Sequence, residues 1–111
     1  MSLIPLASTP FFNNSKLFFS RKELNKIFSC YSIGVSNGNW KDYSIYSNKN
    51  ETSFVIYKHA GSAPDCILTK YKKLKKNKIL FKLKVGINNK KNSDKIENLI
   101  AFLKRKHIKI I

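Results

Sequence analysis

The chain has 111 residues, of which 42% are hydrophobic and 13% are aromatic. This length suits one small domain, and this share of apolar residues can build a packed core, so the composition excludes two independent cores and a disordered chain. Lysine and arginine number 22 against six acidic residues, and the net charge of +16 attracts nucleic acid, anionic lipid or acidic protein.

Residues 1–17 follow neither a helical nor an alternating pattern, and we expect an irregular N-terminal arm there. The first 15 residues contain no lysine or arginine, unlike the charged start of a secretory signal. The chain also lacks the run of about 20 uncharged apolar residues that spans a bilayer. We therefore expect a cytoplasmic protein without a membrane partner.

A first helix is predicted to begin at Ser20. Ser20-Arg21-Lys22-Glu23 has the form of a capping box, in which Ser20 and Glu23 exchange hydrogen bonds with each other's backbone amides. Apolar residues then recur at helical spacing and predict one buried face, formed by Leu24, Ile27, Phe28, Tyr31 and Val35. The segment Ser36-Asn37-Gly38-Asn39 is predicted to end the helix, with Asn37 or Gly38 in the left-handed conformation.

The spacing of apolar residues then changes to alternation, which is typical of strands. Polar segments at 47–51, 60–65 and 74–78 are suited to turns between them. We expect four strands in two hairpins, at Trp40–Tyr46, Ser53–Lys58, Cys66–Lys73 and Ile79–Val85.

Gly86–Asn92 interrupts the alternation, and a second helix is predicted after a cap at Ser93 or Asp94. Its apolar stripe is formed by Ile96, Leu99, Ile100 and Leu103. The predicted fold is therefore α+β: a helix, a four-stranded antiparallel sheet and a C-terminal helix, with both helices on one face of the sheet. The single domain is expected to span residues 18–106, with a short tail at 107–111.

The positive charge is concentrated in the second hairpin. No acidic residue occurs from Cys66 to Ser93, a segment with ten lysines. Eight of these lysines are candidate contacts to an anionic partner: Lys70, Lys72, Lys73, Lys75, Lys76, Lys78, Lys82 and Lys84. Two alternatives remain open for the lysine excess, because lysine on strands also protects against edge aggregation and A/T-rich codons favour lysine over arginine, of which only two are present.

The most distinctive short string is Gly38-Asn39-Trp40-Lys41-Asp42-Tyr43. Trp40 and Tyr43 combine large apolar area with polar tips, and Asp42 can accept a hydrogen bond from either tip or pair with Lys41 or Arg21. We favour a structural corner formed by Arg21, Trp40, Asp42 and Tyr43. The alternative is an exposed aromatic platform for a base or a peptide.

Catalytic and metal-binding motifs are absent from the sequence. Its two cysteines and two histidines lack the spacing of metal ligands, and its four glycines are isolated rather than gathered in a phosphate loop. We expect no metal, no cofactor and no enzymatic activity.

Two segments resemble a small alphaproteobacterial family, domain of unknown function 2794. Phe19-Ser20-Arg21-Lys22-Glu23-Leu24 is similar to its helix start, and Gly38–Ile45 to its Gly-x-Trp-Arg-Asp-Tyr-Ala-Ile-Asp string. Lys41 replaces the family's arginine, and Tyr46 stands where the family has an acid. The resemblance covers about Phe18 to Leu103 and supports the domain boundaries, but it implies no activity.

The sequence therefore favours a small, non-enzymatic binding module whose lysine-rich hairpin contacts nucleic acid or a ribonucleoprotein. The alternative is a protein-interaction or regulatory domain that uses the corner at Trp40 and Tyr43 together with the N-terminal arm. The oligomeric state stays open.

Overall fold

The computed structural model describes residues 16–107. Most of the expected arm at 1–17 and all of the tail after residue 107 lie outside these residues. The described part holds two helices and five strands: α2 (Arg21–Ser36), β1 (Asp42–Ser47), β2 (Glu51–Tyr57), β3 (Cys66–Lys73), β4 (Lys78–Val85), β5 (Asn89–Ser93) and α3 (Ile96–His107).

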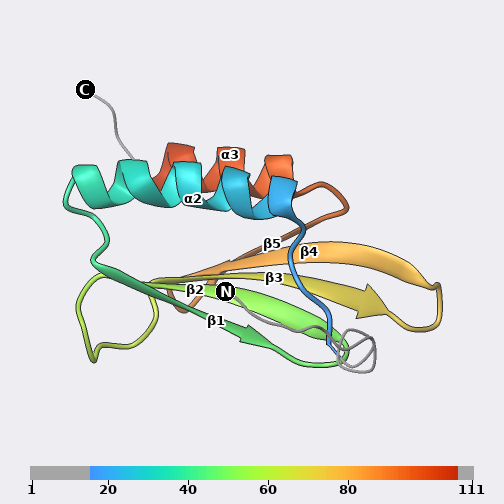
Figure 1. Ribbon diagram of the computed structural model, residues 1–111. Helices are drawn as coiled ribbons and strands as arrows, with labels where there is room; N and C mark the ends of the chain where they lie inside the picture. The colour runs from blue at the N-terminus through green and yellow to red at the C-terminus, as the bar shows by residue number, and fades with distance from the viewer. Residues whose placement is uncertain (1–15, 108–111) are drawn as a thin grey trace.

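The five strands form one antiparallel sheet in the order β1-β2-β3-β4-β5, so each strand pairs with its neighbour in sequence. Both helices cover the same face of this sheet (Figure 1). The α+β class and the order of helix, sheet and helix are as the sequence predicts. The opposite face carries no helix and is called the open face below.

The fifth strand corrects the prediction of four strands. Asn89-Lys90-Lys91-Asn92-Ser93 contains no apolar residue, and it therefore lacks the alternation by which the other strands are recognised. It forms because a turn at Gly86, with a φ of +61°, returns the chain along β4. Backbone pairing between Val85 and Asn89 and between Phe81 and Ser93 then defines an edge strand.

The start of α2 is confirmed as a capping box. The Ser20 hydroxyl accepts a hydrogen bond from the Glu23 amide at 3.1 Å, and the Glu23 carboxylate accepts one from the Ser20 amide at 2.7 Å. Gly38 takes the positive φ that follows the helix, at +78°. The buried face of α2 is rotated from the predicted one, because Cys30 and Gly34 are buried with Ile27 while Val35 is 43% exposed.

The hydrophobic core lies between the helices and the sheet. The predicted stripe of α3 is confirmed, since Ile96, Leu99, Ile100 and Leu103 are all buried. They pack with the helix-facing side chains of the central strands, which include Phe54, Ile56, Leu68, Phe81 and Leu83. Burial of this apolar area is the main favourable term in folding.

The two helices also contact each other directly. Lys26 of α2 forms an ion pair with Glu97 of α3, and this hydrogen bond lowers the pKa of the Glu97 carboxyl below its usual value. Neither helix in the described residues is long and apolar enough to cross a membrane.

Candidate functional site: the open face of the sheet

The pleat of the sheet decides which side chains reach the open face, because alternate residues of a strand point to opposite faces. Paired residues of neighbouring strands share a face, so the register defines rows across the sheet. One open-face row crosses all five strands and consists of Tyr46, Ser53, Thr69, Lys82 and Asn92. The next row along the strands consists of Ser44, Val55, Ile67, Lys84 and Lys90.

Charges are separated across this face. Five lysines from β3, β4 and β5 occupy open-face positions, and we call them the open-face lysines: Lys73, Lys78, Lys82, Lys84 and Lys90. The two acidic residues of the open face, Asp42 and Glu51, belong to β1 and β2. The half formed by β4 and β5 is therefore strongly positive, whereas the half formed by β1 and β2 is neutral to acidic.

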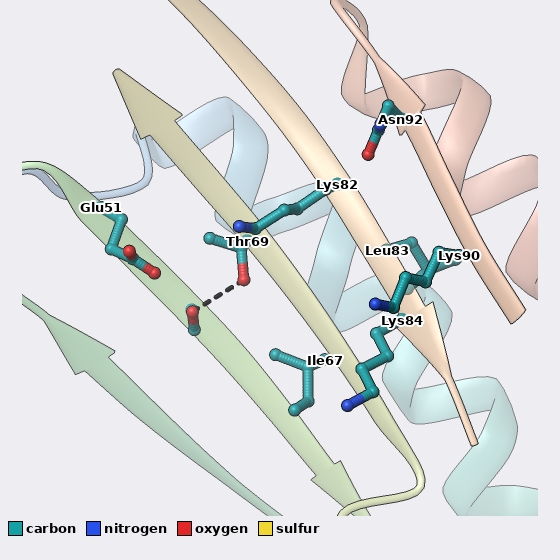
Figure 2. Close-up of a pocket in the computed structure, with 9 residues that line it drawn as sticks. Glu51, Ile67, Thr69, Lys82, Leu83, Lys84, Lys90 and Asn92 are labelled. Atoms are coloured by element: carbon teal, nitrogen blue, oxygen red, sulfur yellow. Dashed lines mark hydrogen bonds between the residues drawn. The ribbon is translucent and has the colours of Figure 1, made fainter. Parts of the chain in front are cut away.

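A cavity of about 310 Å³ lies on the open face between these two halves. Figure 2 shows Lys82, Lys84 and Lys90 extending from β4 and β5, with Ile67 and Thr69 of β3 in the middle. Glu51 stands on the side of β2 and Asn92 on the side of β5. Three cations thus line one side of the cavity, while uncharged groups and one carboxylate line the rest.

Hydroxyl groups and tyrosine rings occupy the neutral half. The Ser53 and Thr69 hydroxyls lie 2.8 Å apart, and those of Ser44 and Tyr57 lie 3.1 Å apart. Hydrogen bonds from Ser44 and Tyr57 lower the pKa of the Tyr46 phenol, whose side chain is well exposed. These groups offer hydrogen bonds and one accessible ring without adding positive charge.

One cation and one ring of this face are already paired. The Lys82 ammonium lies over the Tyr71 ring, 4.9 Å from its centroid. Tyr71 stands on β3 and Lys82 on β4, so this cation–π contact joins the tyrosine-bearing half of the face to the lysine-bearing half.

The sheet divides the eight lysines that the sequence groups together. Lys73, Lys78, Lys82 and Lys84 share the open face, but Lys70 points to the helices, where its ammonium contacts the Glu23 carboxylate at 2.9 Å and the Phe18 carbonyl at 3.0 Å. Lys72 shares the side of Lys70 but is exposed. Grouping by sequence alone therefore combined residues from both faces.

The remaining two of these lysines, Lys75 and Lys76, form the turn between β3 and β4. Pairing with β2 ends at Tyr71 and pairing with β5 ends at Phe81, so the tip of this hairpin extends past both neighbours (Figure 1). The tip is continuous with the open face through Lys73 and Lys78, which are opposite each other. It is fully exposed and carries Leu74 beside its cations.

Trp40 is buried, with only 1% of its surface exposed, so it cannot serve as an exposed platform. Its indole nitrogen donates a hydrogen bond at 2.9 Å to Asp65, not to Asp42. The Asp42 carboxylate instead accepts a hydrogen bond from the neighbouring Tyr43 amide at 2.8 Å. Trp40 and Tyr43 pack against the rings of Tyr31 and of Phe54 in β2.

Arg21 does not belong to this corner. It occupies the first turn of α2, whereas Trp40 packs on Gly34 in the last turn. Thirteen residues of helix separate the two positions by about 20 Å. The proposed pairing of Arg21 with Asp42 is therefore wrong, because a straight helix holds its two ends apart.

Both cysteines are free and buried. Burial raises the pKa of the Cys30 thiol, and burial beside the Asp65 carboxylate raises that of Cys66 further. A thiol with a raised pKa is a poor nucleophile and a poor metal ligand. In residues 16–107, no group of three or more histidine, cysteine, aspartate or glutamate side chains could hold a metal ion.

Several residues of the open face were not recognised from the sequence. They are Ser53, Tyr57, Thr69, Tyr71, Lys90 and Asn92, together with Glu51 and Tyr46. The alternation within β3 and β4 does identify Tyr71 and Lys82 as residues of one face. The contribution of β5 gives no such signal, because that strand lacks an apolar face.

A comparison with protein families gives one match: residues 17–97 fit the family model described as "Protein of unknown function (DUF2794)". The resemblance seen in the sequence is thereby confirmed. No curated protein and no solved structure matches the chain.

Proposed function

Since the chain belongs to the DUF2794 family, whose function is unknown, we propose from its surface chemistry that it is a non-enzymatic nucleic-acid-binding module. The open face of the sheet, extended by the tip of the β3–β4 hairpin, is the contact surface. Its lysines neutralise phosphate groups, and binding gains free energy from the counterions that are released. A free nucleic acid and a ribonucleoprotein present the same phosphate backbone.

One observation carries this proposal: five lysines from three strands lie on the only large sheet surface of the described chain that no helix covers. Lysine that only protects a sheet edge would be needed on an edge strand, whereas Lys82 and Lys84 belong to β4, which has neighbours on both sides. Their exposed positions on a central strand favour an anionic partner.

The protein-interaction alternative loses its central residue. Trp40 is buried against α2 and its indole nitrogen is occupied by Asp65, so it has no surface to offer a partner. Tyr43 keeps a partly exposed ring, but that ring packs on Phe54 and Phe28. No further observation on the described residues favours this alternative.

The proposal is tested by measuring the affinity of the purified full chain for a labelled oligonucleotide by fluorescence anisotropy over a range of salt concentrations. We expect log Kd to rise linearly with log salt, by about 0.7 per neutralised phosphate on a single strand and about 0.9 on a duplex. A variant with all five open-face lysines changed to glutamine should lose most of this slope and most of its affinity.

A second five-site variant supplies the control, with Lys22, Lys41, Lys95, Lys104 and Arg105 changed to glutamine. These exposed residues lie away from the open face, and both variants lose five charges. If net charge alone drives binding, both variants weaken equally and the proposed surface is rejected. If the wild-type chain shows no binding at low salt, the proposed function itself is wrong.

A further inference from the structure

The separation of charge and ring across the open face carries information about the form of the nucleic acid. Five strands about 4.8 Å apart give the face a width of about 19 Å. All five open-face lysines lie on β3, β4 and β5, while the exposed Tyr46 ring and the Glu51 carboxylate lie on β1 and β2. A ligand that fits this face must be anionic on one side only.

We infer that the open face selects single-stranded over duplex nucleic acid, with phosphates along β4 and β5 and unpaired bases over β1, β2 and β3. This inference rests on the proposed function. A single strand presents phosphates on one side and the faces and edges of its bases on the other. A duplex presents phosphates on two strands around each groove and keeps its bases stacked inside, so it would bring phosphate toward Glu51 and leave Tyr46 unused.

The cavity supplies the groups that an unpaired base requires. The hydroxyls of Ser53 and Thr69, the Asn92 amide and the Glu51 carboxylate can exchange hydrogen bonds with the edge of a base. Ile67 adds an apolar contact. Lys82, Lys84 and Lys90 line the same cavity, so one nucleotide can place its phosphate on the lysines and its base among the neutral groups.

Two tyrosines of this face offer rings for stacking. Tyr46 stands at the exposed end of the row that runs through Ser53, Thr69 and Lys82. Tyr71 lies beside the cavity, because the Lys82 ammonium that covers its ring also lines the cavity. Each ring stacked on a base contributes affinity without requiring a particular sequence.

The test compares a labelled single strand with the duplex of the same sequence by fluorescence anisotropy at one salt concentration. We expect the single strand to bind at least about ten-fold more tightly. The variant Tyr46→Leu/Tyr71→Leu should lose affinity for the single strand by at least about five-fold for each ring and keep its affinity for the duplex. Tyr46→Phe/Tyr71→Phe retains both rings and should bind the single strand like the wild type.

The outcomes separate this inference from the proposed function. If the duplex binds as tightly as the single strand, single-strand selection is wrong while nucleic-acid binding stands. If the single strand is preferred but the leucine variant keeps full affinity, the assigned position of the bases is wrong. If neither form binds at low salt, both proposals fail. The comparison of the two nucleic acids uses the wild-type chain, so it decides the selection even if the leucine variant does not fold.

Discussion

The indole of Trp40 lies directly on the backbone of Gly34, on the last turn of α2. A Cβ atom at Gly34 would stand 2.1 Å from Cε3 of Trp40, far inside van der Waals contact. The chain leaving the helix is held at the same place, because the Asn39 amide donates to the Gly34 carbonyl at 2.8 Å. The only tryptophan of the chain is therefore accommodated by a glycine six residues earlier.

We expect Gly34→Ala to destabilise the protein although alanine is the better helix former. Overpacking of a tight core site costs about 1–3 kcal/mol, which exceeds the gain in helix propensity of about 1 kcal/mol. Urea denaturation followed by circular dichroism measures the difference. Ser32→Ala, at an exposed position of the same helix, is the control and should leave stability unchanged or slightly raised; an equal response of both variants would contradict the close packing.

The hydrogen bond between Trp40 and Asp65 should appear as a coupling energy. Trp40→Phe removes the donor and Asp65→Ala removes the acceptor, which is half-buried. We expect a double-mutant cycle to give a coupling of about 1–2 kcal/mol in the free energy of unfolding, because a hydrogen bond to a charged acceptor is stronger than a neutral one. Additive effects of the two changes would show that the contact contributes nothing to stability.

Lys70 is expected to act on stability rather than on binding. Its ammonium lies 2.9 Å from Glu23, and both side chains are largely buried, at 12% and 19% exposed. Lys70→Gln should lower the free energy of unfolding by about 1–2 kcal/mol and leave nucleic-acid affinity within about two-fold. Lys72→Gln removes an exposed cation two residues further along β3 and should change stability by less than about 0.5 kcal/mol. Loss of binding in Lys70→Gln without loss of stability would contradict this assignment.

The Cys66 thiol should make stability fall at alkaline pH. Burial and the Asp65 carboxylate raise its pKa above the ordinary value of 9.0, so the folded thiol stays protonated where the unfolded thiol ionises. Above about pH 9 the unfolded state binds fewer protons, and the free energy of unfolding then decreases with rising pH by up to about 1.4 kcal/mol per unit. The stability advantage of a neutral Cys66 is thus full below pH 9 and is lost above it.

This pH effect is measured as the difference between the wild type and Cys66→Ala, since lysines and tyrosines titrate in both proteins. Between about pH 8 and about pH 10 we expect the wild type to lose about 1 kcal/mol more than the variant. Parallel pH curves for the two proteins would mean that the thiol ionises as readily in the folded state as in the unfolded one.

The sequence determined the features that depend on neighbouring residues. The capping box of Ser20 and Glu23 needs only residues three apart, and the stripe of α3 from Ile96 to Leu103 follows from helical spacing. The strands β3 and β4 alternate clearly, so their limits were predicted within one residue. Local hydrogen bonds and the period of a helix or strand are written in a short stretch of chain.

Only the tertiary structure decided which of these residues meet. Backbone pairing with β4 formed β5 from a segment without apolar side chains, and the pleat sent Lys70 to Glu23 while it sent Lys82 and Lys84 to the open face. Asp65 became the partner of Trp40 from 25 positions away. These contacts depend on the register and on the path of the chain between distant segments, because a backbone hydrogen bond or a buried acceptor carries no pattern in the sequence around it.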